Sequence, residues 1–569
     1  MKTKCLLIFC VTLLFGNTFA GTFTTADTLI PVAAKATATL NGDTSPDPAS
    51  GVIHLDARVY TPDGVAAPAP VVVILPPYGG SKDSGLVTDL AQDFATQGYV
   101  VLTPTMRGFG ESDGLVTFAG PNEVNDVKTI VMALQNGAIG DTPVVNVPVS
   151  SLSKIGVTGA SYGGGMSFEI VRTHVPGLAA VAPIIGWTDL YQALAPNDVP
   201  KFAYIVGLFS SGFDPQNPNY DDQLFQRAKQ LLGGNPEATR TGDADSIDWR
   251  SVIFQPTELN VPMFVIQGWR DWLFPAEQAI SLFQASTNIP FFKMYIGGVG
   301  HAPAKTDITT QEALFLRGQL VRWFDFWLKG IDNGIENEPK VTIAPEHTGD
   351  WTEAGLVTSN TFPLPGTTTL TFLVNRSSLA TSSGGRANVV HGERFGPAVF
   401  GPIEQALGGG STAFITALAA ANQLINSGGD ILDPRITTDL DDTANGTAFS
   451  SAVLPQDAHV LGIPQVSLSV SADAPNTYYY VQLLEKLPDG TTHLVTRGAL
   501  KDHTAKFKKV HPVSFSLFGV NHVFKAGSKI RLRIASRDFP FFLPNLDEGT
   551  FRISHGKNAP SSLTLPIVP

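Results

Sequence analysis

The feature that most constrains this chain is the stretch at residues 155–166, which reads Ile-Gly-Val-Thr-Gly-Ala-Ser-Tyr-Gly-Gly-Gly-Met. An apolar strand runs there into Gly159-Ala160-Ser161-Tyr162-Gly163, which has the G-x-S-x-G form of a nucleophile elbow, and a helix-capable segment follows. A serine on so sharp a strand-to-helix turn has crowded neighbours, so the positions two before and two after it must be small. The pattern also arises by chance in a chain with 55 glycines, so the interpretation of Ser161 as a nucleophile depends on the surrounding sequence.

The sequence on both sides of this stretch alternates between buried strands and helices. Apolar runs at residues 71–75, 99–103 and 179–185 are typical of strands covered on both faces, and residues 122–134 have helical periodicity. This alternation predicts a mostly parallel, doubly wound sheet, in which residues 154–158 form a central strand directly before the elbow.

The pattern changes between residues 187 and 259, which predict an inserted, mainly helical cap over the carboxyl edge of the sheet. Such an insertion either shapes a pocket or decorates the surface, and we favour the pocket. The sheet then resumes with a strand at residues 261–268 that is followed by Asp271. A later strand at residues 291–296 is followed by Gly297-Gly298-Val299-Gly300-His301.

A second domain is predicted beyond residue 337, where the helical pattern fades. Short β-rich runs separated by turn residues there indicate a β-sandwich or jelly roll. An alanine-rich segment at residues 408–426 interrupts these runs and is compatible with one helix. We therefore predict an α/β domain at residues 21–360 and an all-β domain at residues 361–569.

The first twenty residues have the composition of a secretory signal peptide, with two lysines, an apolar run at residues 5–15 and Thr18-Phe19-Ala20 as a cleavage site. The apolar run is shorter than the roughly 20 residues that span a bilayer. We therefore expect cleavage after Ala20 and a secreted protein, extracellular or periplasmic, without stable membrane insertion. Both cysteines, Cys5 and Cys10, would leave with the peptide, so packing without disulfides must stabilise the mature chain.

Charge and composition exclude several classes of partner. The mature chain would carry 36 basic and 50 acidic residues, a net charge of −14, which argues against nucleic acid. The sequence contains no His-x-x-x-His, and the pair Glu346-His347 has no further ligand close by, so we expect no metal. Gly163-Gly164-Gly165 lacks the Lys-Ser/Thr ending of a phosphate-binding loop, and we expect no cofactor.

A serine hydroxyl needs a base, and the base needs a carboxylate that holds its tautomer. The chain order Ser161, Asp271, His301 is the one that α/β-hydrolases use, and each residue follows a predicted strand, so all three would project from one edge of the sheet. Asp189 is an alternative acid, but its place at the start of the cap favours a structural role. The histidines after His301 fall in the linker or the β-rich part, so His301 is the one that follows Asp271 within the predicted sheet.

The tetrahedral intermediate of such a reaction needs hydrogen-bond donors aimed at its oxyanion. One would be the backbone N–H of Tyr162, directly after the nucleophile. The second could come from the loop Pro76-Pro77-Tyr78-Gly79-Gly80, through the phenol of Tyr78 or a backbone amide.

These residues together resemble a known family, which includes cocaine esterase, α-amino acid ester hydrolases and X-Pro dipeptidyl-peptidases. The shared stretches cover roughly residues 51–569. They are Pro77-Tyr78, Arg107-Gly108-x-Gly-x-Ser112, the elbow, Gly268-Trp269-x-Asp271, residues 322–330 (Arg-Trp-Phe-Asp-Phe-Trp-Leu-Lys-Gly), residues 525–532 (Lys-Ala-Gly-Ser-Lys-Ile-Arg-Leu) and the closing residues 561–569.

The resemblance implies an α/β-hydrolase fold with a helical cap and a C-terminal jelly roll, and it implies that the Tyr78 hydroxyl serves the oxyanion hole. His301 follows Gly-Gly-Val-Gly, where the family has a Pro-Trp-x pattern. Asp271 is followed by Trp-Leu-Phe-Pro, without the carboxylates that hold a substrate ammonium in amino-acid ester hydrolases. This difference favours an uncharged acyl group. The predicted substrate-pocket residues are Trp187, Trp269, Trp272, Leu273 and Phe274.

The sequence therefore predicts a secreted serine hydrolase that cleaves carboxylic esters by acyl transfer. The alternative within the enzymes is an X-Pro dipeptidyl-peptidase or an aminoacyl ester or amide hydrolase, in which Asp189 or Asp198 would hold the substrate amine. A hypothesis of another class is a binding protein on the same scaffold, but no residue of the predicted triad is missing. The partner would be a small ester or amide, and the sequence is compatible with a homo-oligomer.

Overall fold

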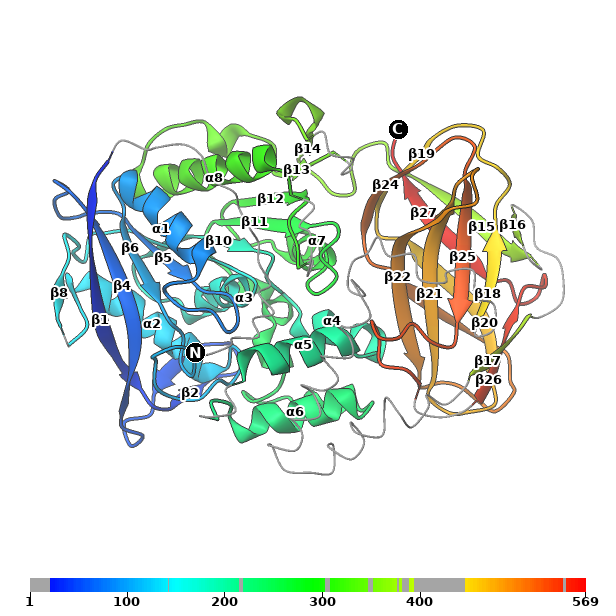
Figure 1. The fold of residues 1–569 in the computed structure, drawn as a ribbon, viewed down its shortest axis with the longest axis horizontal. Coiled ribbons are helices and arrows are strands. Elements are labelled where there is room, and N and C mark those ends of the chain that lie inside the picture. Colours follow the sequence, from blue (N-terminus) through cyan, green and yellow to red (C-terminus); the bar gives the residue numbers. More distant parts are fainter. Residues whose placement is uncertain are drawn as a thin grey trace.

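The computed structural model describes residues 21–141, 143–213, 218–301, 308–345, 351–375, 378–380, 388–392, 446–545 and 549–569. Figure 1 shows two bodies side by side, an α/β domain and a C-terminal domain of strands. The predicted signal peptide and the alanine-rich segment at residues 408–426 lie outside the described residues. No helix among the described residues is long and apolar enough to cross a membrane.

Within the described residues, ten strands form the sheet of the α/β domain in the order β1-β4-β6-β5-β9-β10-β11-β12-β13-β14. The strands from β6 to β13 pair in parallel, and the pairs β1–β4, β4–β6 and β13–β14 are antiparallel. Their bounds are β1 (Phe23–Ala33), β4 (Val52–Pro62), β5 (Val71–Leu75), β6 (Val100–Pro104), β9 (Ile155–Ala160), β10 (Leu178–Ile184), β11 (Met263–Gly268), β12 (Phe292–Gly297), β13 (Val341–Ile343) and β14 (Val357–Ser359). Two small two-stranded ribbons stand apart, β2 (Ala36–Ala38) with β3 (Thr44–Pro46) and β7 (Ala138–Ile139) with β8 (Val145–Asn146).

Helices cover both faces of this sheet, because its central strands are apolar on both sides. One apolar core joins the sheet to α2, α3 and α7, and a second core on the other face joins it to α1 and α8. The helices are α1 (Gly85–Thr96), α2 (Pro121–Gln135), α3 (Tyr162–Glu169), α7 (Glu277–Ala285) and α8 (Thr310–Phe324), and a π-helical turn (Asp325–Lys329) extends the last of them.

The predicted cap is present between β10 and β11. It contains α4 (Leu190–Leu194), α5 (Phe202–Gly212), α6 (Asp222–Leu232) and several short 3₁₀ turns. Helix α5 is almost wholly apolar and buried, because it packs between the sheet edge, α6 and the C-terminal domain.

The C-terminal domain is a β sandwich with its own apolar core. Its strands within the described residues are β15 (Thr368–Asn375), β16 (Ser378–Ala380), β17 (Asn388–Gly392), β18 (Gly446–Ser450), β19 (Ala458–Gly462), β20 (Gln465–Ala472), β21 (Thr477–Lys486), β22 (Thr492–Asp502), β23 (His511–Ser516), β24 (Val520–Phe524), β25 (Lys529–Ala535), β26 (Gly549–Ser554) and β27 (Ser562–Ile567). The predicted fold class, an α/β-hydrolase sheet with a cap and an all-β domain, is therefore confirmed.

The cap and the sandwich are joined by backbone hydrogen bonds. The Ala203 amide donates to the carbonyl of Pro540 (3.0 Å), and the Leu543 amide donates to the carbonyl of Pro200 (2.8 Å). The start of α5 and a loop of the sandwich thus pair much as two strands do, at the side of the α/β domain where the predicted active residues lie.

Candidate active site

Three polar side chains meet where parallel strands of the first sheet end. Ser161 follows β9, Asp271 lies three residues after β11, and His301 lies four residues after β12. All three are buried, with exposed fractions of 7%, 0% and 3%. The carboxyl ends of parallel strands share one edge of the sheet, which explains how residues so distant in the sequence come together.

A continuous chain of hydrogen bonds joins these side chains. His301 Nδ1 lies 2.7 Å from Asp271 Oδ2, and His301 Nε2 lies 2.7 Å from Ser161 Oγ. An ionised carboxylate can only accept, so Nδ1 carries the imidazole proton and Nε2 presents a lone pair to the serine hydroxyl. This is the tautomer that can take a proton from Ser161.

The elbow holds Ser161 in a left-handed backbone conformation, with φ of 60° and ψ of −116°. Non-glycine residues adopt positive φ rarely, and they cluster at functional sites when they do. A side-chain carbon at Gly163 would overlap the carbonyl oxygen of Leu75 on the neighbouring strand β5. The close approach of α3 to the sheet therefore requires glycine there, as the spacing of the motif predicts.

The loop that carries Asp271 is held from two sides. Asp271 Oδ1 accepts hydrogen bonds from the amides of Leu273 (3.1 Å) and Phe274 (3.0 Å). Lys201, just before α5, donates from Nζ to the carbonyl of Leu273 (3.0 Å). Burial of Lys201 lowers the pKa of its ammonium to about 7, although the nearby carboxylates of Asp271 and Glu277 partly offset this effect.

The loop that carries His301 is fixed by a buried glutamate on α8. Glu312 Oε1 accepts from the amide of Gly298 (2.8 Å) and from the hydroxyl of Tyr295 (2.7 Å). On the cap side, the Tyr204 hydroxyl donates to the carbonyl of His301 (3.4 Å). Asp271 therefore orients the imidazole of His301. Glu312 of the α/β domain and Tyr204 of the cap hold the backbone of the loop that carries it.

The rings of the two residues predicted for the oxyanion hole lie beside each other. Tyr162 is the first residue of α3, so its amide has no acceptor within the helix, and its ring centroid lies 5.6 Å from that of Tyr78. Burial raises the pKa of the Tyr78 phenol well above its usual range, so the hydroxyl stays protonated. The Tyr78 hydroxyl forms a hydrogen bond with that of Tyr220 on the cap, which in turn contacts the carbonyl of Phe209 (3.3 Å).

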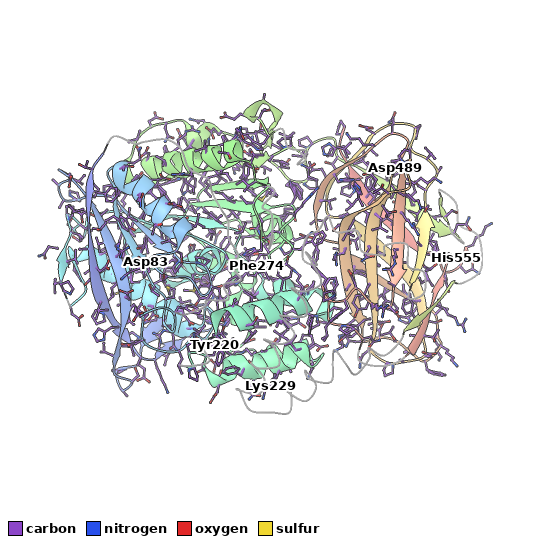
Figure 2. All side chains as sticks on the ribbon, in the orientation of Figure 1. Asp83, Tyr220, Lys229, Phe274, Asp489 and His555 are labelled. Atoms are coloured by element: carbon purple, nitrogen blue, oxygen red, sulfur yellow. The ribbon has the colours of Figure 1, made fainter. Side chains whose placement is uncertain are left out.

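The five predicted pocket residues divide into two groups. Phe274 packs edge-on against the imidazole of His301 (5.1 Å between ring centroids), and Trp187 lies against Phe274 (5.1 Å). Leu273 is wholly buried beside Asp271. Figure 2 labels Phe274 and Tyr220, which both lie in the α/β half of the molecule.

The other two predicted pocket residues face the C-terminal sandwich. The ring of Trp272 packs against Phe541 (5.6 Å between centroids), and the Arg497 guanidinium lies over it. Trp269 packs against Phe362 (6.4 Å) and lines a crevice between the two domains. The structure therefore brings Trp187 and Phe274 to the predicted triad, and it turns Trp269 and Trp272 toward the domain interface.

Asp189 and Asp198, the carboxylates considered for a substrate amine, already have partners. Asp189 caps α4 by accepting from the Gln192 amide (2.9 Å), and Asp198 accepts from the Tyr191 hydroxyl. Asp198 also lies within hydrogen-bond distance of His503 Nε2 on the sandwich (2.9 Å).

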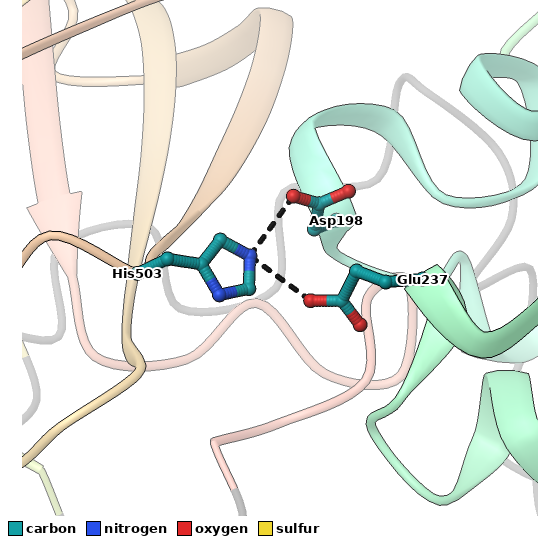
Figure 3. A group of neighbouring side chains, drawn as sticks. All are labelled: Asp198, Glu237 and His503. Carbon is teal, nitrogen blue, oxygen red and sulfur yellow. Dashed lines mark hydrogen bonds and ion pairs between the residues drawn. The ribbon is translucent and has the colours of Figure 1, made fainter. Parts of the chain in front are cut away.

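Figure 3 shows Asp198 together with Glu237 and His503, a cluster that joins the cap to the sandwich. His503 Nε2 lies 2.9 Å from each carboxylate. The ammonium of Lys501 lies 2.8 Å from the same Glu237 oxygen that faces His503. Because a cation already balances this carboxylate, the cluster acts as an ion-paired contact between the domains.

The fold and this group of side chains define an α/β-hydrolase with a C-terminal β sandwich. Residues 50–303 match the model of the X-Pro dipeptidyl-peptidase (S15) family, and residues 333–564 match the model of the X-Pro dipeptidyl-peptidase C-terminal non-catalytic domain. The chain is thus a hydrolase of the S15 family, as the resemblance of its motifs indicates.

Individual relatives are distant but similar over most of their length. A Bacillus cereus protein, provisionally named an Xaa-Pro dipeptidyl-peptidase, is 24% identical over 508 residues, which cover 84% of this chain and 76% of that one. Cocaine esterase of a Rhodococcus species is 22% identical over 91% of this chain and 96% of its own. A CocE/NonD family hydrolase of Staphylococcus aureus has the same fold, with a TM-score of 0.65, 16% identity, and coverage of 95% and 94%.

Two residues that support the site are not among those predicted from sequence. Thr309-x-x-Glu312 has the form of a helix capping box, but the Glu312 side chain contacts Gly298 of the histidine loop. Lys201 is a single cation directly before an apolar helix. Such a lone charge in an apolar segment is the signal that could have identified it.

Proposed function

We propose that this protein is an exported serine hydrolase that cleaves carboxylic esters by acyl transfer. The single observation that carries the proposal is the hydrogen-bond chain from Ser161 through His301 to Asp271. A serine hydroxyl with a correctly oriented imidazole and a buried carboxylate behind it is the arrangement that activates serine as a nucleophile.

In the proposed reaction Ser161 Oγ attacks the ester carbonyl while His301 Nε2 takes its proton. Asp271 stabilises the imidazolium, and the Tyr162 amide and the Tyr78 hydroxyl donate to the oxyanion. His301 then gives the proton to the leaving alcohol. Water, activated by the same imidazole, attacks the acyl-enzyme, releases the acid and restores Ser161.

Esters with an uncharged acyl group are favoured over aminoacyl substrates by the groups near the triad. Phe274 and Trp187 offer apolar surface there, and Asp189 and Asp198 are engaged in the cap. A buried ammonium without a carboxylate partner is costly. The second candidate function is Xaa-Pro dipeptidyl-peptidase or aminoacyl hydrolase, which the name of the S15 family and that of the Bacillus cereus relative support equally.

The test is a rate panel on the mature protein. Aryl esters of acetate and of longer acids, an aminoacyl ester and an Xaa-Pro anilide are compared in the wild type and in Ser161→Ala, with Ser286→Ala at the end of α7 as a matched control. We expect ester hydrolysis that falls at least about 10³-fold in Ser161→Ala and is unchanged in the control. Hydrolysis that survives Ser161→Ala contradicts the mechanism, and preference for the anilide contradicts the ester assignment.

Export is proposed on the composition of residues 1–20. Expression of the full chain with a C-terminal tag, followed by N-terminal sequencing of the exported protein, tests it. A mature N-terminus at Gly21 is expected, and retention of the full-length chain in the cytoplasm contradicts the proposal.

A further inference from the structure

A second tyrosine hydroxyl lies next to the one predicted for the oxyanion hole. Tyr220, two residues before α6, is buried, and its hydroxyl forms a hydrogen bond with the hydroxyl of Tyr78. The centroids of the two rings lie 6.3 Å apart. A side-chain carbon at Gly212, the last residue of α5, would overlap both the Tyr78 ring and the Tyr220 hydroxyl. The end of α5 therefore admits this pair of tyrosines because a glycine stands there.

The segment that carries Tyr220 is paired with the α/β domain. The Val116 amide donates to the carbonyl of Asn219 (2.8 Å), and the Asp221 amide donates to the carbonyl of Val116 (3.1 Å). These two bonds lie on either side of Tyr220, which forms a parallel bridge with Val116. The side-chain amide of Asn219 also donates to the carbonyl of Gly108 (2.7 Å). The backbone of the α/β domain thus fixes the place of the Tyr220 hydroxyl relative to Tyr78.

The protons of the two hydroxyls can be arranged in two ways. A phenol has one proton to donate, and its oxygen can also accept. Burial raises the pKa of both phenols well above their usual range, so both protons are present at neutral pH. The Tyr220 proton has two acceptors, the carbonyl of Phe209 (3.3 Å) and the Tyr78 oxygen. When Tyr220 donates to Phe209, Tyr78 can donate to Tyr220. When Tyr220 donates to Tyr78, the Tyr78 proton must go to another acceptor.

We propose that Tyr220 is a positioning residue of the oxyanion hole, which directs the Tyr78 proton toward the substrate by donating its own proton to the Tyr78 oxygen. This inference rests on the proposed esterase mechanism, in which the Tyr78 hydroxyl donates to the oxyanion. As charge develops on the substrate oxygen, the Tyr78 hydroxyl rotates toward it and the Tyr220 hydroxyl rotates from Phe209 to Tyr78. Each proton stays on its own oxygen. Hydrogen bonds in such a chain strengthen one another, and a bond to a charged acceptor is stronger than one to a neutral acceptor.

The experiment compares the hydrolysis of p-nitrophenyl acetate by Tyr220→Phe, Tyr78→Phe and the double variant. Tyr220→Phe removes a single oxygen atom, and we expect kcat to fall about tenfold with KM little changed, because the lost hydrogen bond is made in the transition state. Tyr78→Phe should lower kcat by about 10²–10³, the usual effect of losing an oxyanion donor. The double variant should be no slower than Tyr78→Phe, because Tyr220 acts through Tyr78.

Tyr191→Phe is the matched control, since Tyr191 is a buried tyrosine of the cap whose hydroxyl bonds to Asp198. This variant should keep the wild-type kcat. A second readout is inhibition by an alkyl trifluoromethyl ketone, to which Ser161 adds reversibly so that the ketone oxygen becomes an oxyanion. Its inhibition constant should weaken in Tyr220→Phe by the same factor as kcat/KM, which a general loosening of the cap would not produce.

A further variant, Asn219→Ala, keeps the inference testable if Tyr220→Phe does not fold. It removes the bond to Gly108 and leaves the Tyr220 ring intact, and its loss of kcat should also vanish in the Tyr78→Phe background. Losses of equal size with and without the Tyr78 hydroxyl overturn the role of Tyr220. Wild-type rates in Tyr220→Phe or in Tyr78→Phe do the same, and with hydrolysis still dependent on Ser161 they leave the esterase function standing. Hydrolysis that persists in Ser161→Ala overturns the proposed function itself.

Discussion

Lys201 offers a sharp test of how the interface between the cap, the α/β domain and the sandwich is stabilised. Its side chain is wholly buried, donates to the Leu273 carbonyl and lies 4.6 Å from the ring centroid of Phe518. Burial lowers the pKa of this lysine from 10.5 to about 7. Between these two pH values the unfolded chain holds a proton that the folded protein has lost, so raising the pH stabilises the folded state.

The size of this effect follows from the two pKa values. Each pH unit in that window contributes about 1.4 kcal/mol, so Lys201 should add about 2 kcal/mol to the free energy of unfolding between pH 7.5 and pH 9. Below pH 7 the folded wild type must bury the ammonium. Lys201→Met removes both the charge and its cost, so the variant should be more stable than the wild type at pH 6 and should lose this advantage as the pH rises.

The assay is urea unfolding of the wild type, Lys201→Met and the exposed control Lys506→Met at pH 6, 7.5 and 9. The difference in unfolding free energy between wild type and variant cancels the contributions of other groups. Curves of stability against pH that run parallel for Lys201→Met and the wild type would refute the reasoning, because they would show that the buried lysine does not titrate in this range.

Three further predictions concern buried contacts around the site. Arg107→Met should lower the free energy of unfolding by about 3–5 kcal/mol, because it leaves Asp126 buried without its ion-pair partner (2.6 Å). In urea unfolding, the double variant Arg107→Met with Asp126→Leu should be more stable than Arg107→Met alone. Gly165→Ala should yield little soluble protein, since its methyl group would overlap the Trp187 ring beneath α3, and normal expression would contradict this. Glu312→Leu should lower the free energy of unfolding by about 2–4 kcal/mol, because it leaves the Gly298 amide and the Tyr295 hydroxyl without their acceptor. Glu312→Gln should lower it less, and thermal or urea unfolding measures both.

The sequence was sufficient to locate the strands that precede the three predicted active residues. The apolar runs before Ser161, Asp271 and His301 are the strands β9, β11 and β12, and parallel strands carry whatever follows them to one edge. Small errors occurred at element ends: the helix-capable segment predicted after the elbow already begins at Tyr162, inside the motif, and changes to a 3₁₀ turn at Ile170. Local hydrogen bonding at helix ends is poorly encoded by periodicity.

The sequence did not predict which way side chains point in irregular loops. Trp269 and Trp272 flank Asp271 in the chain, but the turn there has no regular period and directs both rings toward the sandwich. That surface belongs to a separate domain whose first strand begins at Thr368, so no local pattern could reveal it.

The backbone pairing between the start of α5 and the loop of the sandwich restricts how substrate can reach Ser161. A cap that swung away as an independent lid would have to break the bonds of Ala203 to Pro540 and of Leu543 to Pro200, or pull the sandwich with it. The far end of α5, near Gly212, has no such tie to the sandwich among the described contacts. Opening of the cap should therefore be a rotation about the tied end of α5 at Lys201. The opposite end of α5, beside Tyr78, would then move away from the active residues and let substrate reach Ser161.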